Sequence, residues 1–423
     1  MEGGKTMEIA RDLYLQKLID RMHNTMIKIV TGIRRCGKSY LLSKLFRKHL
    51  LKTGVRPDHI IELALDDRQN AALRHPDELL KYVYSQVKDA DIHYILLDEI
   101  QYVDDFEGVL NSFLRKDNLD VYVTGSNSKF LSSDVITEFR GRGDEVHLFP
   151  LSFGEYAAAI GADKRDAWQM YLTYGGLPLT ATMSSHERKA EYLQRLLQKV
   201  YLKDILERNR LYHTEELQEL LCILASAVGS FSNPRNLADT FKSTKKVTLS
   251  ANTIATYGSY FENAFLLHRA QRYDIKGKRY IDSLYKYYFE DIGLRNACLN
   301  FRQMEENHLM ENIIYNELRM RGYSVDVGIV PIQAKQPDGK YARQRLEVDF
   351  VANQGNKRFY LQSAFRMHDE KKIEQENRPL RHIDDSFKKI IVVGDSGLLW
   401  RNNDGHVMIN ILDFLLKPNS LEL

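Results

Sequence analysis

A glycine turn near the start of the chain constrains the fold more than any other feature. The segment TGIRRCGKSYLL, residues 31–42, fits the pattern G-x-x-x-x-G-K-[ST] at every fixed position. An apolar segment precedes it and an amphipathic helical pattern follows, the setting in which backbone N–H groups wrap a phosphate at the positive end of a helix. The pattern predicts a nucleoside triphosphate site made of Gly32, Ile33, Arg34, Arg35, Cys36, Gly37, Lys38, Ser39 and Tyr40.

Within this turn, three side chains have distinct expected roles. Lys38 is expected to act in catalysis by neutralising charge on the β- and γ-phosphates, and the Ser39 hydroxyl to complete the shell of a Mg²⁺ ion. Cys36 occupies a variable position of the pattern, where the loop tolerates a small residue. The alternative is an exposed thiol with a lowered pKa next to Lys38, which would make nucleotide binding sensitive to oxidants.

A second motif, YILLDEIQYV, brings acids to the end of a predicted strand. Asp98 and Glu99 follow four apolar residues, at the carboxyl edge where open α/β sheets bind ligands. We expect Asp98 to hold Mg²⁺ through water and Glu99 to polarise the attacking water; the alternative is two solvated acids. A later strand, VYVTGSN, ends in Ser126 and Asn127, and Asn127 is a further catalytic candidate near the γ-phosphate.

Strands alternate with helices from residue 26 to residue 127, which predicts a parallel sheet covered on both faces. Residues 1–153 are therefore expected to form an α/β P-loop domain. The alternation then stops, and residues 154–212 have helical patterns interrupted by YGGLP. This segment is predicted to be a helical lid region.

Residues 213–282 have the pattern of three helices followed by two short strands around DIKGKRY, the layout of a winged helix. The third helix, after Ser250, is expected to enter a major groove of double-stranded DNA while nearby cations meet phosphates. The alternative is a lid or protein contact with solvated charges. The candidate contacts are Asn252, Thr253, Thr256 and Tyr257 on the third helix, Lys242, Lys245 and Lys246 in a loop before it, and Lys276, Lys278 and Arg279 on the wing.

Several motifs together resemble a family of AAA+-superfamily ATPases found in bacteria and archaea: GIRRCGKS, LLDEIQ, VTGSNSKFL, FRGRGDEVHLFPLSFGEY and YLTYGGLP. The most specific block contains Gly141, Arg142, Pro150, Leu151, Ser152, Phe153, Glu155 and Tyr156. The resemblance implies an AAA+-like fold, ATP as the nucleotide, and Arg140 or Arg142 as a catalytic arginine finger in a neighbouring subunit of a homo-oligomer. A structural salt bridge is the alternative role of these arginines.

The resemblance also implies that residues 283–423 form a restriction-endonuclease-like α/β domain. Such nucleases place an acid at the end of one strand and an acid-x-lysine on the next, to hold a metal and activate water. Here the second strand has Gln362 and Ala364 at those positions, and an amide binds a divalent metal far less well than a carboxylate. We therefore expect a degenerate domain that does not cleave DNA; the acids available to it are Glu311, Glu317, Glu347 and Asp349.

Composition narrows the remaining choices. Lys and Arg total 60 against 57 Asp and Glu, a net charge of +3, so any basic surface must be local. The three cysteines show no metal-ligand spacing, the N-terminus lacks the apolar stretch of a signal peptide, and no apolar run reaches the ~18 residues of a membrane helix. We expect a cytoplasmic ATPase that changes conformation on DNA, with no membrane contact. A signalling switch that controls a protein partner and an active ATP-dependent nuclease are the alternatives.

Overall fold

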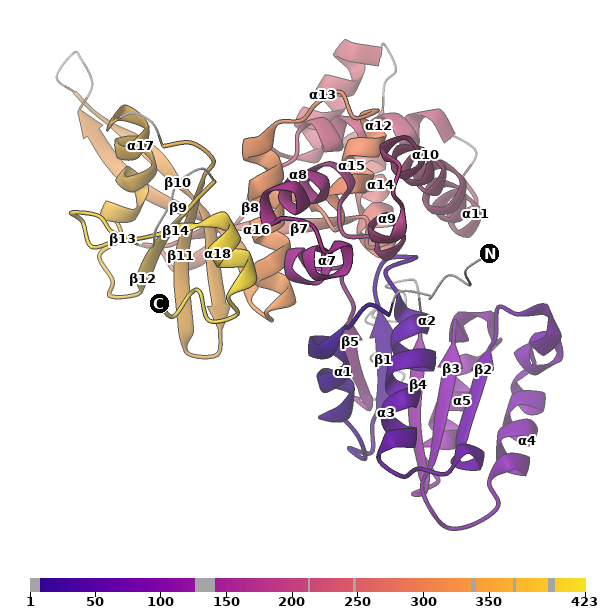
Figure 1. The fold of residues 1–423 in the computed structure, drawn as a ribbon. Coiled ribbons are helices and arrows are strands. Elements are labelled where there is room, and N and C mark those ends of the chain that lie inside the picture. The colour runs from indigo at the N-terminus through magenta and orange to yellow at the C-terminus, as the bar shows by residue number, and fades with distance from the viewer. Residues whose placement is uncertain are drawn as a thin grey trace. The chain divides into compact units, whose positions relative to one another are not determined.

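The computed structural model describes residues 8–125, 141–211, 214–245, 249–335, 340–367, 370–394 and 400–423 (Figure 1). These residues belong to two compact units. The first comprises the described part of Met1–Pro150 together with Asn263–Phe265, and the second comprises Leu151–Glu262 and Leu266–Leu423. Among the described residues, no helix combines the length and apolar character that crossing a bilayer requires.

The first unit is built on a five-stranded sheet in the order β2-β3-β4-β1-β5, with every neighbouring pair parallel. This confirms the predicted parallel α/β sheet. The strands are β1 (Ile27–Thr31), β2 (Ile60–Ala64), β3 (His93–Asp98), β4 (Leu119–Thr124) and β5 (Gly143–His147). The helices are α1 (Asp12–Ile19), α2 (Lys38–Tyr40), the π-helical turn η1 (Leu41–Phe46), α3 (Arg47–Lys52), α4 (Pro76–Gln86) and α5 (Phe106–Phe113), with short 3₁₀ turns η2 (Pro57–His59), η3 (Arg68–Arg74) and η4 (Ile100–Tyr102).

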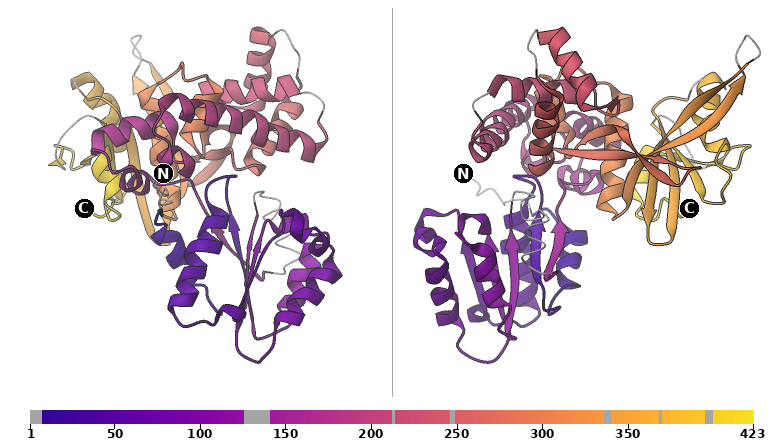
Figure 2. Two further views of the ribbon diagram at one scale, coloured as in Figure 1. Left: turned by 45° about the vertical axis from the view of Figure 1, so that its right-hand side comes forward. Right: turned by 180° about the vertical axis from the view of Figure 1, so that it is seen from behind.

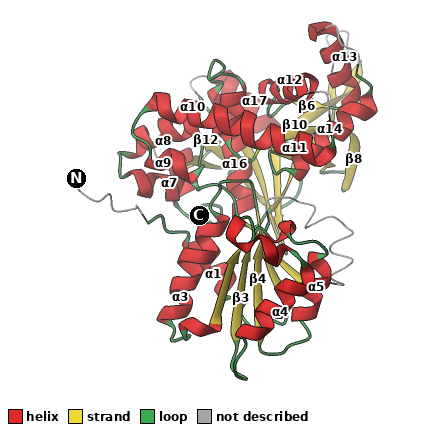
Figure 3. Ribbon diagram, turned by 90° about the vertical axis from the view of Figure 1, so that its right-hand side faces the viewer, coloured by secondary structure: helices red, strands yellow, loops and turns green. Residues whose placement is uncertain are grey.

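Helices cover both faces of this sheet. Figure 3 shows α1 and α3 on one side of the strands and α4 and α5 on the other. Strand β1 is buried at all five positions, as expected for a strand with apolar neighbours on both faces. On the α4–α5 face the buried core contains Ile27, Ile29, Leu79, Val109 and Phe113, among others. Because all neighbouring strands are parallel, their carboxyl ends lie at one edge of the sheet, and the candidate site lies at that edge.

The second unit begins with helices: α7 (Phe153–Ile160), α8 (Lys164–Tyr174), α9 (Pro178–Thr182), α10 (His186–Leu196), the π-helical turn η6 (Leu197–Leu202) and α11 (Lys203–Asn209). The YGGLP segment forms the turn between α8 and α9. Gly175 has a φ of 68°, and a Cβ there would lie 2.4 Å from Asp291 Oδ1; a Cβ on Gly176 would lie 2.2 Å from the Leu151 carbonyl oxygen. Both glycines are thus required by close packing within this unit.

The next segment has the element order α12 (Thr214–Ser226), β6 (Phe231–Ser232), α13 (Pro234–Lys245), α14 (Ala251–Asn263), β7 (Leu267–Asp274) and β8 (Arg279–Phe289). The rest of the chain contributes α15 (Ile292–Cys298), α16 (Glu306–Met320), β9 (Ser324–Lys335), β10 (Tyr341–Gln354), β11 (Lys357–Ala364), α17 (Glu370–Arg381), β12 (Lys388–Val393), β13 (Trp400–Arg401), β14 (Val407–Asn410) and α18 (Ile411–Leu416). Strands β10, β11 and β12 cover the segments LEVDFVA, RFYLQSAF and KKIIVV.

The strands of this unit form one nine-stranded sheet in the order β13-β14-β12-β11-β10-β9-β7-β8-β6. The β7–β8 hairpin joins it because β7 pairs in parallel with β9, from Arg272 opposite Val327 to Asp274 opposite Ile329. The right-hand view of Figure 2 shows the orange strands continuing into the gold ones. The boundary predicted between residues 282 and 283 falls inside β8. The hairpin is therefore continuous with the C-terminal sheet.

Candidate active site

The phosphate loop follows β1 and has the backbone conformations that the glycine pattern requires. Gly32 has a φ of 137° and Gly37 a φ of 105°, values that favour glycine. A Cβ on Gly32 would also lie 2.2 Å from the Leu148 carbonyl oxygen, so the loop packs against the chain that leaves β5. Lys38 is 4% exposed and donates to the carbonyls of Gly32 at 3.0 Å and Ile33 at 3.1 Å. Its ammonium is thus held inside the curve of the loop.

A buried arginine from the N-terminal segment holds this loop, and sequence reasoning missed it. Arg11 is 3% exposed and donates to the carbonyl of Cys36 at 3.2 Å and to that of Phe149 at 2.7 Å. It therefore connects the loop to the segment after β5. Cys36 itself is fully buried. The alternative of an exposed, oxidant-sensitive thiol at Cys36 is wrong, because the side chain packs under the loop.

The two acids of YILLDEIQYV lie at the carboxyl end of β3, next to the end of β4. Thr124, the last residue of β4, donates from Oγ1 to Asp98 Oδ1 at 2.5 Å and accepts from the Glu99 backbone N–H at 2.9 Å. Burial raises the pKa of the Asp98 carboxyl, against the opposing effect of hydrogen bonds from Thr124 and Ser39. Since Ser39 and Asp98 contact each other, the expected Mg²⁺ ligands face the same point beside the loop.

Glu99 has a φ of 54°, which is uncommon for a residue with a side chain. Its carboxylate accepts a hydrogen bond from the Gln101 amide, and its N–H is fixed by Thr124. Such backbone strain clusters at functional sites. Thr124 was missed by sequence reasoning, although a polar residue at the end of an apolar strand was a usable signal. Its partners could be known only from the neighbouring positions of β3 and β4.

Of the remaining catalytic candidates, only Arg142 is among the described residues. Asn127 and Arg140 are outside the described residues. Arg142 is exposed, and its carbonyl accepts from the N–H of Ile27 at 2.9 Å, where β1 begins. The phosphate loop follows the other end of β1. Arg142 therefore lies at the amino edge of the sheet, away from the phosphate loop of its own chain.

Part of the predicted DNA-contacting set lies where expected and part does not. Lys242 and Lys245 belong to helix α13 instead of a loop, because α13 continues to Lys245; Lys246 is outside the described residues. On α14, Asn252 and Thr256 are exposed and Thr253 is half-buried, but Tyr257 is 5% exposed and faces the interior. The hairpin cations Lys276, Lys278 and Arg279 are exposed; Lys276 pairs with Asp384 at 3.5 Å and Arg279 with Asp274 at 3.9 Å.

In the C-terminal sheet, three carboxylates meet one ammonium that the sequence did not indicate. Lys286 of β8 is 3% exposed, and its Nζ lies 2.8 Å from Glu311 and 2.5 Å from Glu347. Burial opposes the charge of Lys286, but Glu311, Glu347 and Asp349 outweigh it and raise its pKa above the ordinary value. Burial, with Glu311 next, raises the pKa of Asp349 well above its usual range. Tyr288 also donates to Glu311, at 2.6 Å.

Strand β11 contributes neutral groups beside this cluster. Gln362 Oε1 lies 3.4 Å from the backbone nitrogen of Asp349, and the N–H of Ser363 donates to Asp349 Oδ2 at 2.7 Å. Glu317 lies outside the cluster, where it accepts from Arg321 at 2.8 Å. Of the acids considered from the sequence, Glu311, Glu347 and Asp349 therefore come together and Glu317 does not.

Comparison with known proteins places these features in context. Residues 24–157 match the AAA domain family, and residues 165–305 match a family described as a domain of unknown function, DUF8612. An uncharacterized protein of Haemophilus influenzae is 32% identical over 97% of this chain and 99% of its own. One of Methanocaldococcus jannaschii is 25% identical over 92% of this chain and 88% of its own.

Two solved structures are similar to this chain at low sequence identity. The Aeropyrum pernix ORC1 protein in complex with DNA has 10% identity over 70% of this chain and 93% of its own, with a TM-score of 0.32. AMPPCP-bound DnaA from Aquifex aeolicus has 14% identity over 59% of this chain and 85% of its own, also with a TM-score of 0.32. The Haemophilus influenzae protein is 32% identical over nearly the full length of both chains, and residues 24–157 match the AAA domain family. The chain therefore belongs to the same family as the Haemophilus influenzae protein and carries an AAA domain near its N-terminus.

Proposed function

We propose that the protein binds ATP with Mg²⁺, hydrolyses the ATP, and couples its nucleotide state to a conformational change on double-stranded DNA. One observation carries the first part: the phosphate loop after β1 and the Asp98–Thr124–Glu99 network after β3 and β4 share one edge of the sheet. Lys38 would move from its carbonyl partners to the phosphates. Glu99 would accept a proton from the attacking water.

The residues beside the loop fit Mg²⁺, an ion that prefers oxygen ligands. Ser39 and Asp98 would hold it, directly or through water. When bound, the ion neutralises charge on the β- and γ-phosphates. The partial burial of the Asp98 carboxyl favours this role, because a cation beside it would offset the cost of burying its negative charge.

An arginine finger in this protein would act between the subunits of a homo-oligomer. Arg142 lies at the opposite edge of the sheet from its own phosphate loop, so it could complete only a site in a neighbouring subunit. Arg140 is the alternative finger. In either case, one subunit would supply positive charge to the γ-phosphate held by the next.

DNA contact is assigned to the segment α12–α14 with the β7–β8 hairpin, interpreted as a winged helix. Three helices precede a hairpin, and β6 pairs with β8 at the end of the nine-stranded sheet. Asn252 and Thr256 are exposed on α14, and Lys242 is exposed on α13. Such a surface offers polar groups to base edges and ammonium groups to phosphates.

The test combines hydrolysis with DNA binding. Duplex DNA should stimulate ATP turnover by the wild type, whereas a signalling switch would show no stimulation. Replacing Lys242, Lys245 and Lys246 with Ala should weaken duplex binding with little sequence dependence. The slope of log affinity against log salt should flatten by up to about 3, one for each lost phosphate contact.

A variant with Lys52, Lys116 and Lys164 replaced by Ala is the matched control, because these three lysines are exposed and the net charge changes by the same amount. An unchanged salt slope in the first variant, or an equal change in the control, would remove the assigned DNA surface. Basal ATP turnover without DNA should be the same in both variants.

We further propose that the C-terminal domain is a nuclease-like domain without cleavage activity. The Lys286 ammonium lies among the acids that would otherwise converge on a metal, and Gln362 offers a neutral amide. Supercoiled plasmid incubated with the protein, ATP and either Mg²⁺ or Mn²⁺ should stay intact. Nicking that disappears in Asp349→Ala would establish the nuclease alternative, whereas nicking that survives this change would identify a contaminant.

A further inference from the structure

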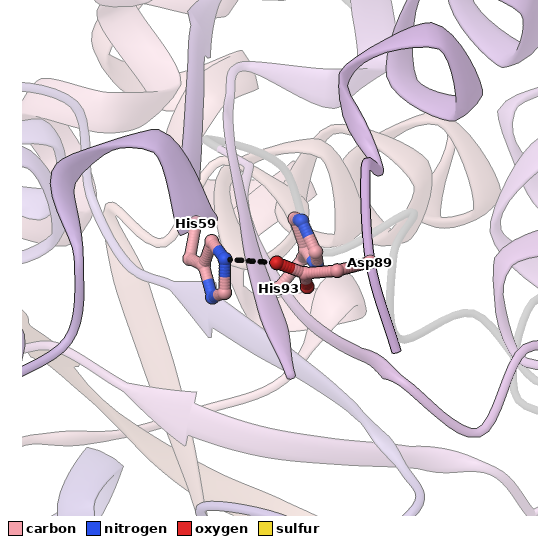
Figure 4. Close-up of side chains that lie close together, drawn as sticks. All are labelled: His59, Asp89 and His93. Atoms are coloured by element: carbon pink, nitrogen blue, oxygen red, sulfur yellow. Dashed lines mark hydrogen bonds and ion pairs between the residues drawn. The ribbon is translucent and has the colours of Figure 1, made fainter. Parts of the chain in front are cut away.

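A second cluster of ligating side chains lies in the first unit, at the edge of the sheet opposite the phosphate loop. His59 ends the 3₁₀ turn before β2, His93 begins β3, and Asp89 lies in the loop before β3. Because β2 and β3 are parallel neighbours, their amino ends lie together. One nitrogen from each histidine and one Asp89 oxygen lie within 4.8 Å of one another (Figure 4).

The protonation of His93 leaves one ring nitrogen ready to bind a cation. Its Nδ1 lies 2.8 Å from the Asp91 carbonyl oxygen, which can only accept, so Nδ1 carries the hydrogen. The Nε2 lone pair is then available, and among the described residues this buried nitrogen has no hydrogen-bond partner. Leaving a buried polar atom unpaired costs about 1–3 kcal/mol. A histidine whose other nitrogen donates to a carbonyl is the usual arrangement of a metal ligand.

The other two members are already at ligand spacing. His59 Nε2 lies 3.1 Å from Asp89 Oδ2, and the dashed line in Figure 4 joins these atoms. In a tetrahedral site with bonds of about 2.0–2.1 Å, neighbouring ligand atoms lie roughly 3.3 Å apart. The rings of His59 and His93 stack with centroids 4.3 Å apart. With the Nε2 of His93 turned toward these two atoms, a small approach of His93 or Asp89 would bring all three to one cation.

In the structure, an arginine supplies positive charge to this cluster. The Arg56 guanidinium donates to Asp89 and contacts His59 Nε2, and its side chain is 55% exposed. Because the side chain reaches solvent, it can leave without uncovering a buried charge. Arg56 and a metal ion would thus compete for the same two ligands, and Arg56 does not contact His93 in any described hydrogen bond or ion pair.

We propose that His59, Asp89 and His93 bind a zinc-like divalent cation, with a water in the fourth position. Two imidazoles and one carboxylate favour a borderline ion such as Zn²⁺ over Mg²⁺, which prefers oxygen ligands. The site is therefore distinct from the Mg²⁺ site beside the phosphate loop. It would connect the start of β2 to the loop before β3 and stabilise that edge of the first unit.

The test uses tag-free, full-length protein freed of metal by a chelator and dialysed against ZnCl₂ with excess Mg²⁺. The wild type should take up about one zinc ion per chain and gain thermal stability. His93→Gln and Asp89→Asn should each weaken zinc binding at least roughly tenfold. Arg56→Gln should tighten it, since the competing guanidinium is gone. Cobalt(II) in place of zinc should give the visible absorption of a tetrahedral site.

His75→Gln is the matched control, because His75 is exposed on the same unit and outside the cluster, and it should bind zinc as the wild type does. Asp89 is on the surface, so Asp89→Asn remains informative if His93→Gln does not fold; ATP binding monitors folding in each variant. A wild type that takes up no zinc overturns the site. Full stoichiometry and affinity in Asp89→Asn, or weaker binding in Arg56→Gln, would overturn it as well.

Discussion

Glu99→Gln should bind ATP as tightly as the wild type and hydrolyse it roughly 10²–10⁴-fold more slowly. The amide keeps the size of the side chain and the Thr124 contact of the backbone N–H, but it cannot accept a proton from water. Lys38→Ala should instead lose nucleotide affinity by roughly 10–100-fold, since it removes a charge-assisted contact worth about 1.5–3 kcal/mol. Turnover and equilibrium binding of ATP, measured separately, distinguish the two defects.

Glu107→Gln provides the matched control for the acid. Glu107 lies in the first turn of α5 and is not part of the assigned site, so the same change there should leave turnover intact. Wild-type turnover in both Glu99→Gln and Lys38→Ala would refute the assigned site. Loss of affinity in Glu99→Gln would show that this acid binds nucleotide instead of activating water.

Lys286→Met should destabilise the second unit by about 3–5 kcal/mol at pH 7, the usual cost of removing one partner from a buried ionic cluster. Glu311 of α16 and Asp349 of β10 would then repel each other without the Lys286 ammonium to offset their charges. The pKa of Asp349, which burial and Glu311 already raise, should stay raised in the folded variant. Stability from such groups is present below their unfolded pKa values and is lost as pH rises through the folded ones, so the defect should shrink toward pH 4.

Calorimetric melting of the full chain at pH 7 and at lower pH measures this effect. Lys278→Met is the control, because Lys278 is exposed on the same hairpin. Glu311→Gln added to Lys286→Met should restore part of the lost stability by removing one of the uncompensated charges. A Lys286→Met protein as stable as the Lys278→Met protein at pH 7 would contradict the cluster.

The sequence was sufficient to predict strands and helices, because their patterns involve residues close together in the chain. The apolar run before Gly32 and the amphipathic run after it predicted strand and helix, and the first sheet is parallel as expected. Contacts between segments far apart in the sequence could not be predicted. Arg11 reaches Phe149, and Lys286 reaches Glu347, and no local pattern marks either pair. Lysine was sought on the second strand of the nuclease pattern, whereas the ammonium comes from the hairpin.

The pairing of β7 with β9 has a practical consequence for dividing the chain. A fragment that stops at residue 282 would interrupt β8 and leave β7 without its β9 neighbour, and a fragment that starts at residue 283 would leave β9 as a bare edge. Unpaired edges of this kind recruit strands from other molecules and lead to aggregation. The described hairpin and C-terminal strands are therefore best produced as a single fragment.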